Sequence, residues 1–133
     1  MEDGIEFAIV ECDINHLKGV NDAFGHDVGD EYIRNSCKIL CDVFKHSSVF
    51  RVGGDEFEVI VTGDDYINRD ERMKMLRNRI EKASKISSVK EGKASFAAGI
   101  AVYEPGTDEG VANVKKRADV AMYQNKALNR YGA

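Results

Sequence analysis

A glycine-rich turn between two apolar runs most constrains what this chain can fold into. The runs 48–52 and 57–61 are rich in β-branched and aromatic residues, a composition typical of strands. The linker 53–56 reads Gly-Gly-Asp-Glu, and glycine favours tight connections because its backbone is conformationally free. The pattern therefore predicts a β-hairpin. Asp55 and Glu56 at its tip repel each other unless a cation or water lies between them.

A second acidic centre stands earlier in the chain. Asp13 directly follows the largely apolar run 7–12. If this run pairs with the hairpin in one sheet, Asp13 meets Asp55 and Glu56 at one end of that sheet. Converging carboxylates and a backbone carbonyl form an oxygen-only site, which suits hard divalent cations. The alternative is a solvated acidic hairpin without chemistry, and the hairpin alone favours neither interpretation.

Hydrophobic periodicity predicts eight elements in the order β-α-α-β-β-α-β-α. The predicted strands are 5–12, 48–52, 57–61 and 94–103, and the predicted helices are 15–24, 27–44, 68–84 and 111–129. Helices packed on a mainly antiparallel sheet make an α+β fold. Gly99, inside a strand, predicts a bulge or a close contact with another element.

Length and charge narrow the function classes. A chain of 133 residues predicts one domain, 1–133. The net charge of -4 argues against non-specific nucleic-acid binding, which needs a basic face. A phosphate-bearing ligand remains compatible, because a metal and a few local cations can balance its charge. No signal peptide or long apolar span stands out, which predicts a cytoplasmic domain without membrane contact, while leaving room for a membrane-anchored parent protein.

The chain has three cysteines, Cys12, Cys37 and Cys41. They form no CxxC pair, and an odd number fits no closed disulfide framework. We expect buried free thiols in a reducing compartment rather than a zinc site.

Three ordered blocks of residues together resemble one family. Gly53-Gly54-Asp55-Glu56-Phe57 is similar to the signature of the GGDEF family, the diguanylate cyclases. The segment 13–30 resembles that family's metal and nucleotide segment, and 118–130 resembles its C-terminal helix. The resemblance covers most of the chain and implies the palm-like sheet shared by nucleotide cyclases and polymerases. The helix with which the family usually opens is expected to be missing here.

The resemblance implies a magnesium site, with manganese as a substitute ion. Asp13, the backbone carbonyl of Ile14, Asp55 and Glu56 would hold the metal. Asp55 and Glu56 would also be catalytic, with Asp55 polarising the attacking hydroxyl.

The resemblance also implies a GTP site. Asn21 and Asp30 would recognise guanine, and Gly53 and Gly54 would lie against the substrate. Lys18, Lys126 and Arg130 would bind phosphates. These residues also have structural alternatives. Asn21 can be a turn residue, and Asp30 can stabilise its helix through the helix dipole, because it lies in the first turn. Each cation can be a solvated surface charge.

Four positions depart from the family's pattern. Asn15 replaces a second aspartate and Leu17 a phenylalanine, while Asn129 and Tyr131 replace the residues that usually flank Arg130. The first change lowers the local negative charge, and the last two leave the placement of Arg130 open.

A product-inhibition site is expected to be absent. Many family members bind their product through an Arg-x-x-Asp motif ahead of the hairpin. Phe44 and Ser47 occupy those places here, and neither offers the charge that such a site requires.

The resemblance implies that two GTP are condensed into cyclic di-GMP with release of two pyrophosphates, in bacterial second-messenger signalling. A transient homodimer would be the active form, and a fused or partner sensory domain is expected in the parent protein. The alternative from another class is a catalytically silent GTP-binding module that regulates a neighbouring domain. A second alternative is an enzyme that also accepts ATP, although Asp30 favours guanine because adenine lacks the matching pair of donors.

Overall fold

The computed structural model describes residues 5–131, with side chains through Lys126. The elements in chain order are β1 (Ala8–Ile14), α1 (Leu17–Phe24), α2 (His26–Val43), β2 (Ser48–Arg51), β3 (Glu56–Val61), α3 (Gly63–Ile67), α4 (Arg69–Ser84), β4 (Phe96–Val102) and α5 (Val111–Tyr131). The predicted order is confirmed, with the short helix α3 added ahead of α4.

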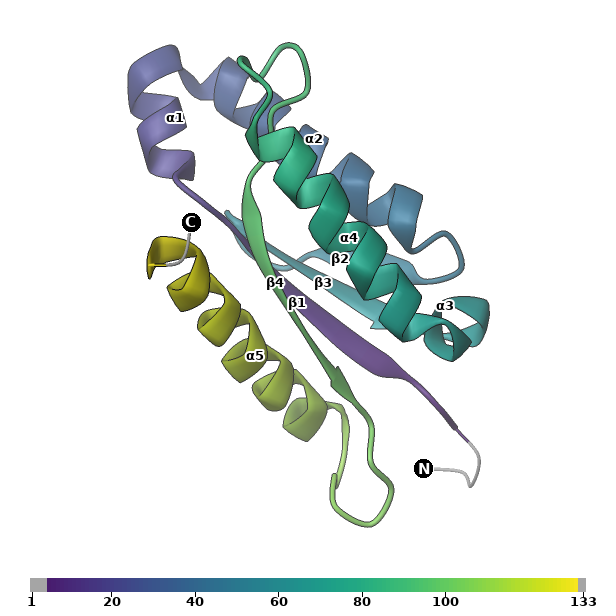
Figure 1. Ribbon diagram of the computed structural model, residues 1–133. Helices are drawn as coiled ribbons and strands as arrows, with labels where there is room; N and C mark the ends of the chain where they lie inside the picture. The colour runs from purple at the N-terminus through teal and green to yellow at the C-terminus, as the bar shows by residue number, and fades with distance from the viewer. Residues whose placement is uncertain (1–4, 132–133) are drawn as a thin grey trace.

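The four strands form one antiparallel sheet in the order β2-β3-β1-β4 (Figure 1). The predicted α+β class with an antiparallel sheet is therefore confirmed. The predicted bounds of the first strand were wrong, because Asp13 lies inside β1 rather than after it. The ladder continues to this point because Asp13 pairs in register with Glu56, and the Ile14 N–H donates to the Asp55 carbonyl at 2.8 Å.

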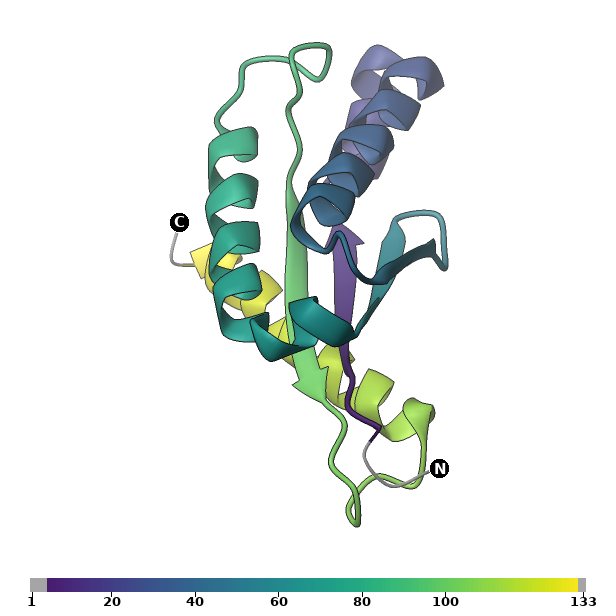
Figure 2. The ribbon, with the colours of Figure 1, turned by 90° about the vertical axis from the view of Figure 1, so that its right-hand side faces the viewer.

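Helices cover both faces of the sheet (Figure 2). On one face, Leu40 of α2, Phe44 just after α2 and Leu76 of α4 enter the larger core, where they meet the even-numbered residues of β1 from Ala8 to Ile14. On the other face, α5 packs its buried Val114 and Ala118 against a smaller cluster. Strand β1 is thus buried on both sides, which explains its nearly continuous apolar sequence.

Helix α5 crosses β4 at Gly99. A methyl group at this position would overlap backbone atoms of Ala121 and Met122. The Asn125 side chain accepts a hydrogen bond from the Ala98 N–H at 3.1 Å, one turn further along the helix. Gly99 is therefore a close contact between backbones, one of the two alternatives that the sequence predicted.

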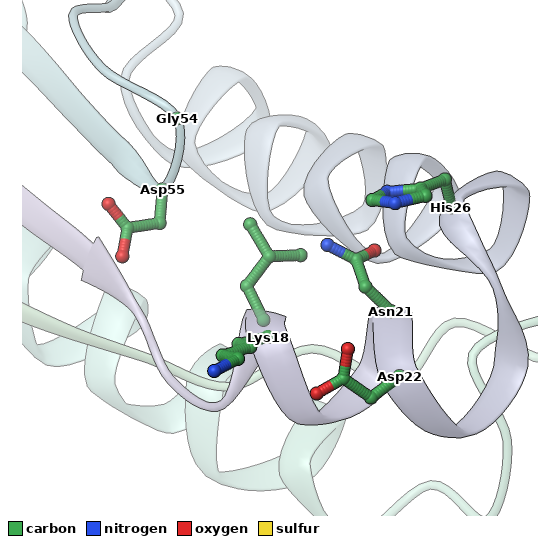
Figure 3. A pocket seen from close by; sticks show the side chains of 7 residues that line it. Lys18, Asn21, Asp22, His26, Gly54 and Asp55 are labelled. Atoms are coloured by element: carbon green, nitrogen blue, oxygen red, sulfur yellow. The ribbon is translucent and has the colours of Figure 1, made fainter.

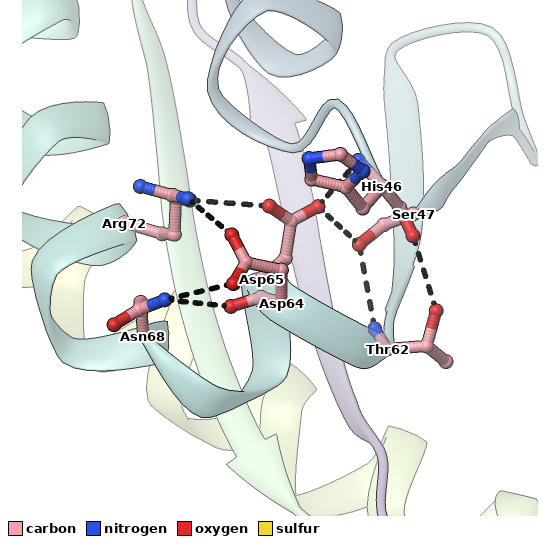
Figure 4. Close-up of polar contacts among 7 residues, drawn as sticks. All are labelled: His46, Ser47, Thr62, Asp64, Asp65, Asn68 and Arg72. Carbon is pink, nitrogen blue, oxygen red and sulfur yellow. Dashed lines mark hydrogen bonds and ion pairs between the residues drawn. The ribbon is translucent and has the colours of Figure 1, made fainter.

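The helix that the sequence did not predict, α3, carries a completely buried carboxylate. Asp65 accepts hydrogen bonds from the His46 N–H at 2.8 Å, from the Ser47 hydroxyl at 2.7 Å and from the Arg72 guanidinium at 3.1 Å (Figure 4). Burial alone would raise the pKa of Asp65, but these three donors outweigh it and hold the pKa below its ordinary value. Asp65 thus joins the α2–β2 connection to α4.

The expectation of three buried thiols was partly wrong. Cys12 is buried in β1, but Cys37 is only half-buried and Cys41 is exposed. Cys37 packs partly against the larger core, and its Sγ atom lies 4.0 Å from that of Cys41. The buried apolar side chains of α2 are Tyr32, Ile33, Ile39, Leu40 and Val43. Among the residues that the structure describes, no helix has the length and hydropathy needed to cross a bilayer.

Candidate active site

A pocket of about 290 Å³ opens between α1 and the tip of the β2–β3 hairpin. Its lining residues are Leu17, Lys18, Asn21, Asp22, His26, Gly54 and Asp55. Figure 3 shows the Asp55 carboxylate at one side of this pocket, with Asn21 and His26 at the other. The pocket unites two of the segments that the sequence marked as functional, 13–30 and 53–57.

A tight turn carries the chain from β1 into α1. His16 has a left-handed backbone with φ of 60°, which is uncommon for a residue with a side chain. The Asn15 side-chain amide donates to the Ser95 hydroxyl at 3.0 Å, and the Asn15 backbone carbonyl accepts from the Tyr32 hydroxyl at 2.8 Å. Asn15, a departure from the family's pattern, is therefore a structural residue here that holds the turn against its neighbours.

The hairpin tip is held by Arg51. Its guanidinium donates to the Gly53 carbonyl at 3.2 Å and to the Gly54 carbonyl at 2.8 Å. Neither glycine has a positive φ, so the turn does not use the backbone angles that only glycine adopts easily. A methyl group at Gly54 would point into open space. Because Gly54 lines the pocket, the absence of a side chain there leaves the backbone accessible to a ligand.

Asn21 is positioned by a glycine on the next helix. A methyl group at Gly29 of α2 would overlap the Asn21 side-chain oxygen. The bare backbone of Gly29 thus makes room for the amide between α1 and α2. Asn21 lines the pocket, and its role in recognising guanine stays a prediction.

Asp13 and Glu56 form the acidic end of the sheet, where they lie opposite each other on β1 and β3. One Asp13 oxygen, Oδ2, lies 2.7 Å from the Lys126 ammonium of α5. The other, Oδ1, is buried and has no hydrogen-bond partner among the described residues. An unpartnered buried carboxylate oxygen beside a second carboxylate fits a hard cation. Within residues 5–126, no group of three His, Cys, Asp or Glu side chains converges closely enough to hold a metal ion.

The remaining predicted residues lie at different distances from this centre. Lys18 lines the pocket, and Lys126 contacts Asp13. Asp30 is exposed on α2 and is absent from the pocket lining, so its role in recognising guanine stays a prediction. Arg130 falls in α5, but its side chain lies outside the described residues.

A second acidic pair lies next to the site, under α5. Glu11 and Glu58 are register neighbours on β1 and β3 and are both buried. Lys115 contacts Glu58 at 3.2 Å. Burial, followed by the nearby Glu58 and Asp119 carboxylates, raises the pKa of Glu11 to about 8, although Lys115 opposes the shift. Glu11 is therefore largely protonated at neutral pH.

Sequence reasoning missed four residues of this region. Asp22 and His26 line the pocket, Arg51 holds the hairpin tip, and Gly29 makes room for Asn21. Asp22 and His26 stood within the matched segment, so their proximity to Asn21 was the available signal. Gly29 also lies in that segment but acts on Asn21 across two helices, and Arg51 stands just ahead of the two glycines whose carbonyls it contacts.

Comparison with known proteins agrees with the family resemblance of the sequence. The family model described as "Diguanylate cyclase, GGDEF domain" matches residues 2–131. The chain is 35% identical over 121 residues to the signaling protein YkoW of Bacillus subtilis, covering 89% of this chain and 15% of YkoW. It is 32% identical over 133 residues to the bifunctional diguanylate cyclase/cyclic di-GMP phosphodiesterase MucR of Pseudomonas aeruginosa, covering 99% and 19%. The chain thus spans less than a fifth of the length of these two relatives.

Solved structures agree with the fold. The active GGEEF domain of a diguanylate cyclase from Vibrio cholerae superposes with a TM-score of 0.74 at 25% identity, covering 92% of this chain and 77% of that one. The GGDEF domain of DgcB from Caulobacter crescentus, solved with c-di-GMP, gives 0.73 at 27% identity, with 93% and 74% covered.

Proposed function

The chain belongs to the GGDEF family of diguanylate cyclase domains, and from its site we propose that it condenses two GTP into cyclic di-GMP. The single observation that supports this most is the pocket that places Asp55 opposite Asn21, next to the acidic pair of Asp13 and Glu56. A nucleotide in this pocket would have a carboxylate near its sugar and phosphates and an amide near its base. Recognition and reaction would thus use opposite ends of one cavity.

The reaction forms a bond between a 3′-hydroxyl oxygen and an α-phosphorus, and it breaks the bond from that phosphorus to pyrophosphate. The hydroxyl proton would pass to solvent, and Asp55 is the carboxylate that we propose polarises the attacking hydroxyl. Bound magnesium, or manganese in its place, would neutralise phosphate charge and lower the hydroxyl pKa. Asp13, the Ile14 carbonyl, Asp55 and Glu56 are the proposed metal-binding residues. The rest of the catalysis would be positioning and electrostatics.

Substrate recognition would come from the two helices and the hairpin. Asn21 and Asp30 would bind guanine, with the Asp30 carboxylate accepting from the N1–H and the N2 amine. Gly54 borders the pocket without a side chain, and together with Gly53 it would let the nucleotide approach the backbone. Lys18, Lys126 and Arg130 would bind the phosphates.

We also propose that the family's product-inhibition site is absent from this chain. Phe44 is 1% exposed in the larger core, and the Ser47 hydroxyl donates to Asp65 at 2.7 Å. Both side chains therefore make internal contacts, and Figure 4 shows that of Ser47 with Asp65. An arginine at position 44 would have to leave the core to reach a phosphate.

The test is incubation of concentrated protein with GTP and magnesium, measuring pyrophosphate and cyclic di-GMP. The Asp55→Ala variant should keep the fold, because Asp55 lies at a turn tip, and should lose turnover. Loss of a stabilisation of several kcal/mol predicts a rate lower by on the order of a thousandfold or more. GTP binding without any product in the parent chain would instead support the silent regulatory module. Full activity of Asp55→Ala would contradict the assignment of Asp55.

A further inference from the structure

The contact between Asp13 and Lys126 joins residues 113 positions apart and closes the acidic end of the sheet. The Lys126 ammonium lies 2.7 Å from Asp13 Oδ2, and the Asp13 side chain is only 18% exposed. A single ammonium therefore balances a carboxylate that belongs to the proposed metal site.

This arrangement leaves the acidic pair under-compensated. Within residues 5–126, Asp13 Oδ1 is buried and finds no hydrogen-bond partner, and Glu56 lies opposite Asp13 on the neighbouring strand. Like charges that face each other across two strands destabilise a sheet. The ammonium neutralises one of the two negative charges through a single oxygen, whereas a divalent cation could bind both carboxylates and neutralise both charges.

Helix α5 does not need this ion pair to hold its place. Its backbone packs directly on Gly99, and Asn125 accepts from the Ala98 N–H at 3.1 Å. Both contacts lie within about one turn of Lys126. The long and flexible lysine side chain can therefore move while the helix remains docked.

We propose that Lys126 is an internal counter-ion that pairs with the Asp13 carboxylate until a divalent cation displaces it. The displaced ammonium is then free to bind the nucleoside triphosphate. This inference rests on the proposed function for the identity of the metal site. It adds that the metal and the triphosphate bind cooperatively. The metal releases Lys126 from Asp13, and the triphosphate then supplies a new anionic partner for the released ammonium. By linkage, nucleotide must then increase metal affinity as much as metal increases nucleotide affinity.

The test measures Mn²⁺ binding to the whole chain without nucleotide, by calorimetry and by the electron paramagnetic resonance of free Mn²⁺. Removing the competing charge in Lys126→Met should tighten Mn²⁺ binding by about tenfold, the change that ~1.4 kcal/mol produces. Lys126→Arg keeps the charge and should bind Mn²⁺ as the parent does. Lys116→Met, an exposed lysine of the same helix, should also leave the affinity unchanged. Asp13→Asn should abolish the binding that Lys126→Met strengthens.

A purely structural Lys126 predicts a different result. In that case Lys126→Met would lower the melting temperature in EDTA and leave Mn²⁺ affinity equal to or weaker than that of the parent, and the proposal would be overturned. Absence of Mn²⁺ binding in the parent and in Lys126→Met would overturn it as well. The readout does not depend on turnover: tighter Mn²⁺ binding in a chain that makes no cyclic di-GMP would refute the proposed function alone, and unchanged binding in an active enzyme would refute this inference alone.

Discussion

Gly29 sets the position of the Asn21 amide, and its effect can be separated from any effect on folding. The added methyl of Gly29→Ala would push the Asn21 side chain out of its place between α1 and α2. Because Asn21 is a flexible side chain, the cost to the fold should be small, and alanine is the better helix former by roughly 0.5–1 kcal/mol.

We therefore expect Gly29→Ala to bind GTP several-fold more weakly, since one hydrogen bond is worth roughly 0.5–1.5 kcal/mol. Its stability should stay equal to or above that of the parent. Gly19→Ala in α1 is the matched control, because a methyl there meets open space. Calorimetric titration of GTP with magnesium present makes the comparison, and equal affinity in both variants would show that Asn21 does not contact the nucleotide.

Glu11 gives the chain a pH-dependent stability. Its pKa is raised to about 8 in the folded chain from about 4.5, so the folded state binds the proton more tightly than the unfolded state does. Stability should then fall as the pH rises from about 4.5 to about 8, by at most ~1.4 kcal/mol per pH unit. Glu11→Gln, which is neutral at every pH, should remove most of this slope.

Denaturant unfolding at a series of pH values measures the slope. Glu71→Gln, an exposed carboxylate in the first turn of α4, should retain the parent's pH dependence. If Glu11→Gln kept the parent's slope, the source of the pH dependence would lie elsewhere.

At the scale of elements, Asp65 of α3 ties the α2–β2 connection to α4. Its carboxylate is completely buried, and Arg72 also contacts the exposed Asp64 at 3.2 Å. Removing a buried ion-pair partner leaves donors and a charge unsatisfied, which costs about 3 kcal/mol. An exposed pair contributes less than about 1 kcal/mol.

We expect Asp65→Ala to lose about 3 kcal/mol of unfolding free energy and Asp64→Ala to lose less than about 1 kcal/mol, as measured by denaturant titration. The His46 and Ser47 amides should also exchange their hydrogens faster in Asp65→Ala. Equal losses in the two variants would mean that Asp65 does not anchor the connection.

At the scale of the whole molecule, the proposed site of one chain would bind one GTP, while the proposed product joins two nucleotides symmetrically. Two copies facing each other across a two-fold axis would satisfy that symmetry. On this proposal, turnover per chain should rise with protein concentration. Fusion to a parallel coiled-coil dimer should raise the rate at low concentration and remove the dependence. A constant rate per chain across dilution, together with no effect of the fusion, would contradict a dimeric active form.

The local sequence determined the elements and most of their order. Alternating and 3.6-residue patterns depend on near neighbours, so the β2–β3 hairpin and the apolar face of α4 with Met73 and Leu76 could be predicted. The spacing of the family's residues likewise identified Asn21, Lys18 and Asp55, which the pocket brings together. The short helix α3 escaped prediction because its main stabilising residue, Asp65, finds its partners on other elements.

Tertiary structure alone decided the contacts between distant segments. The pairing of β1 with β3 places Asp13 opposite Glu56 and Glu11 opposite Glu58, and the docking of α5 on Gly99 brings Lys126 to Asp13. Each of these contacts depends on which strands are neighbours and where a helix crosses them. Such choices arise from burial summed over the whole chain, so the charge balance of the site is a property of the fold rather than of any motif.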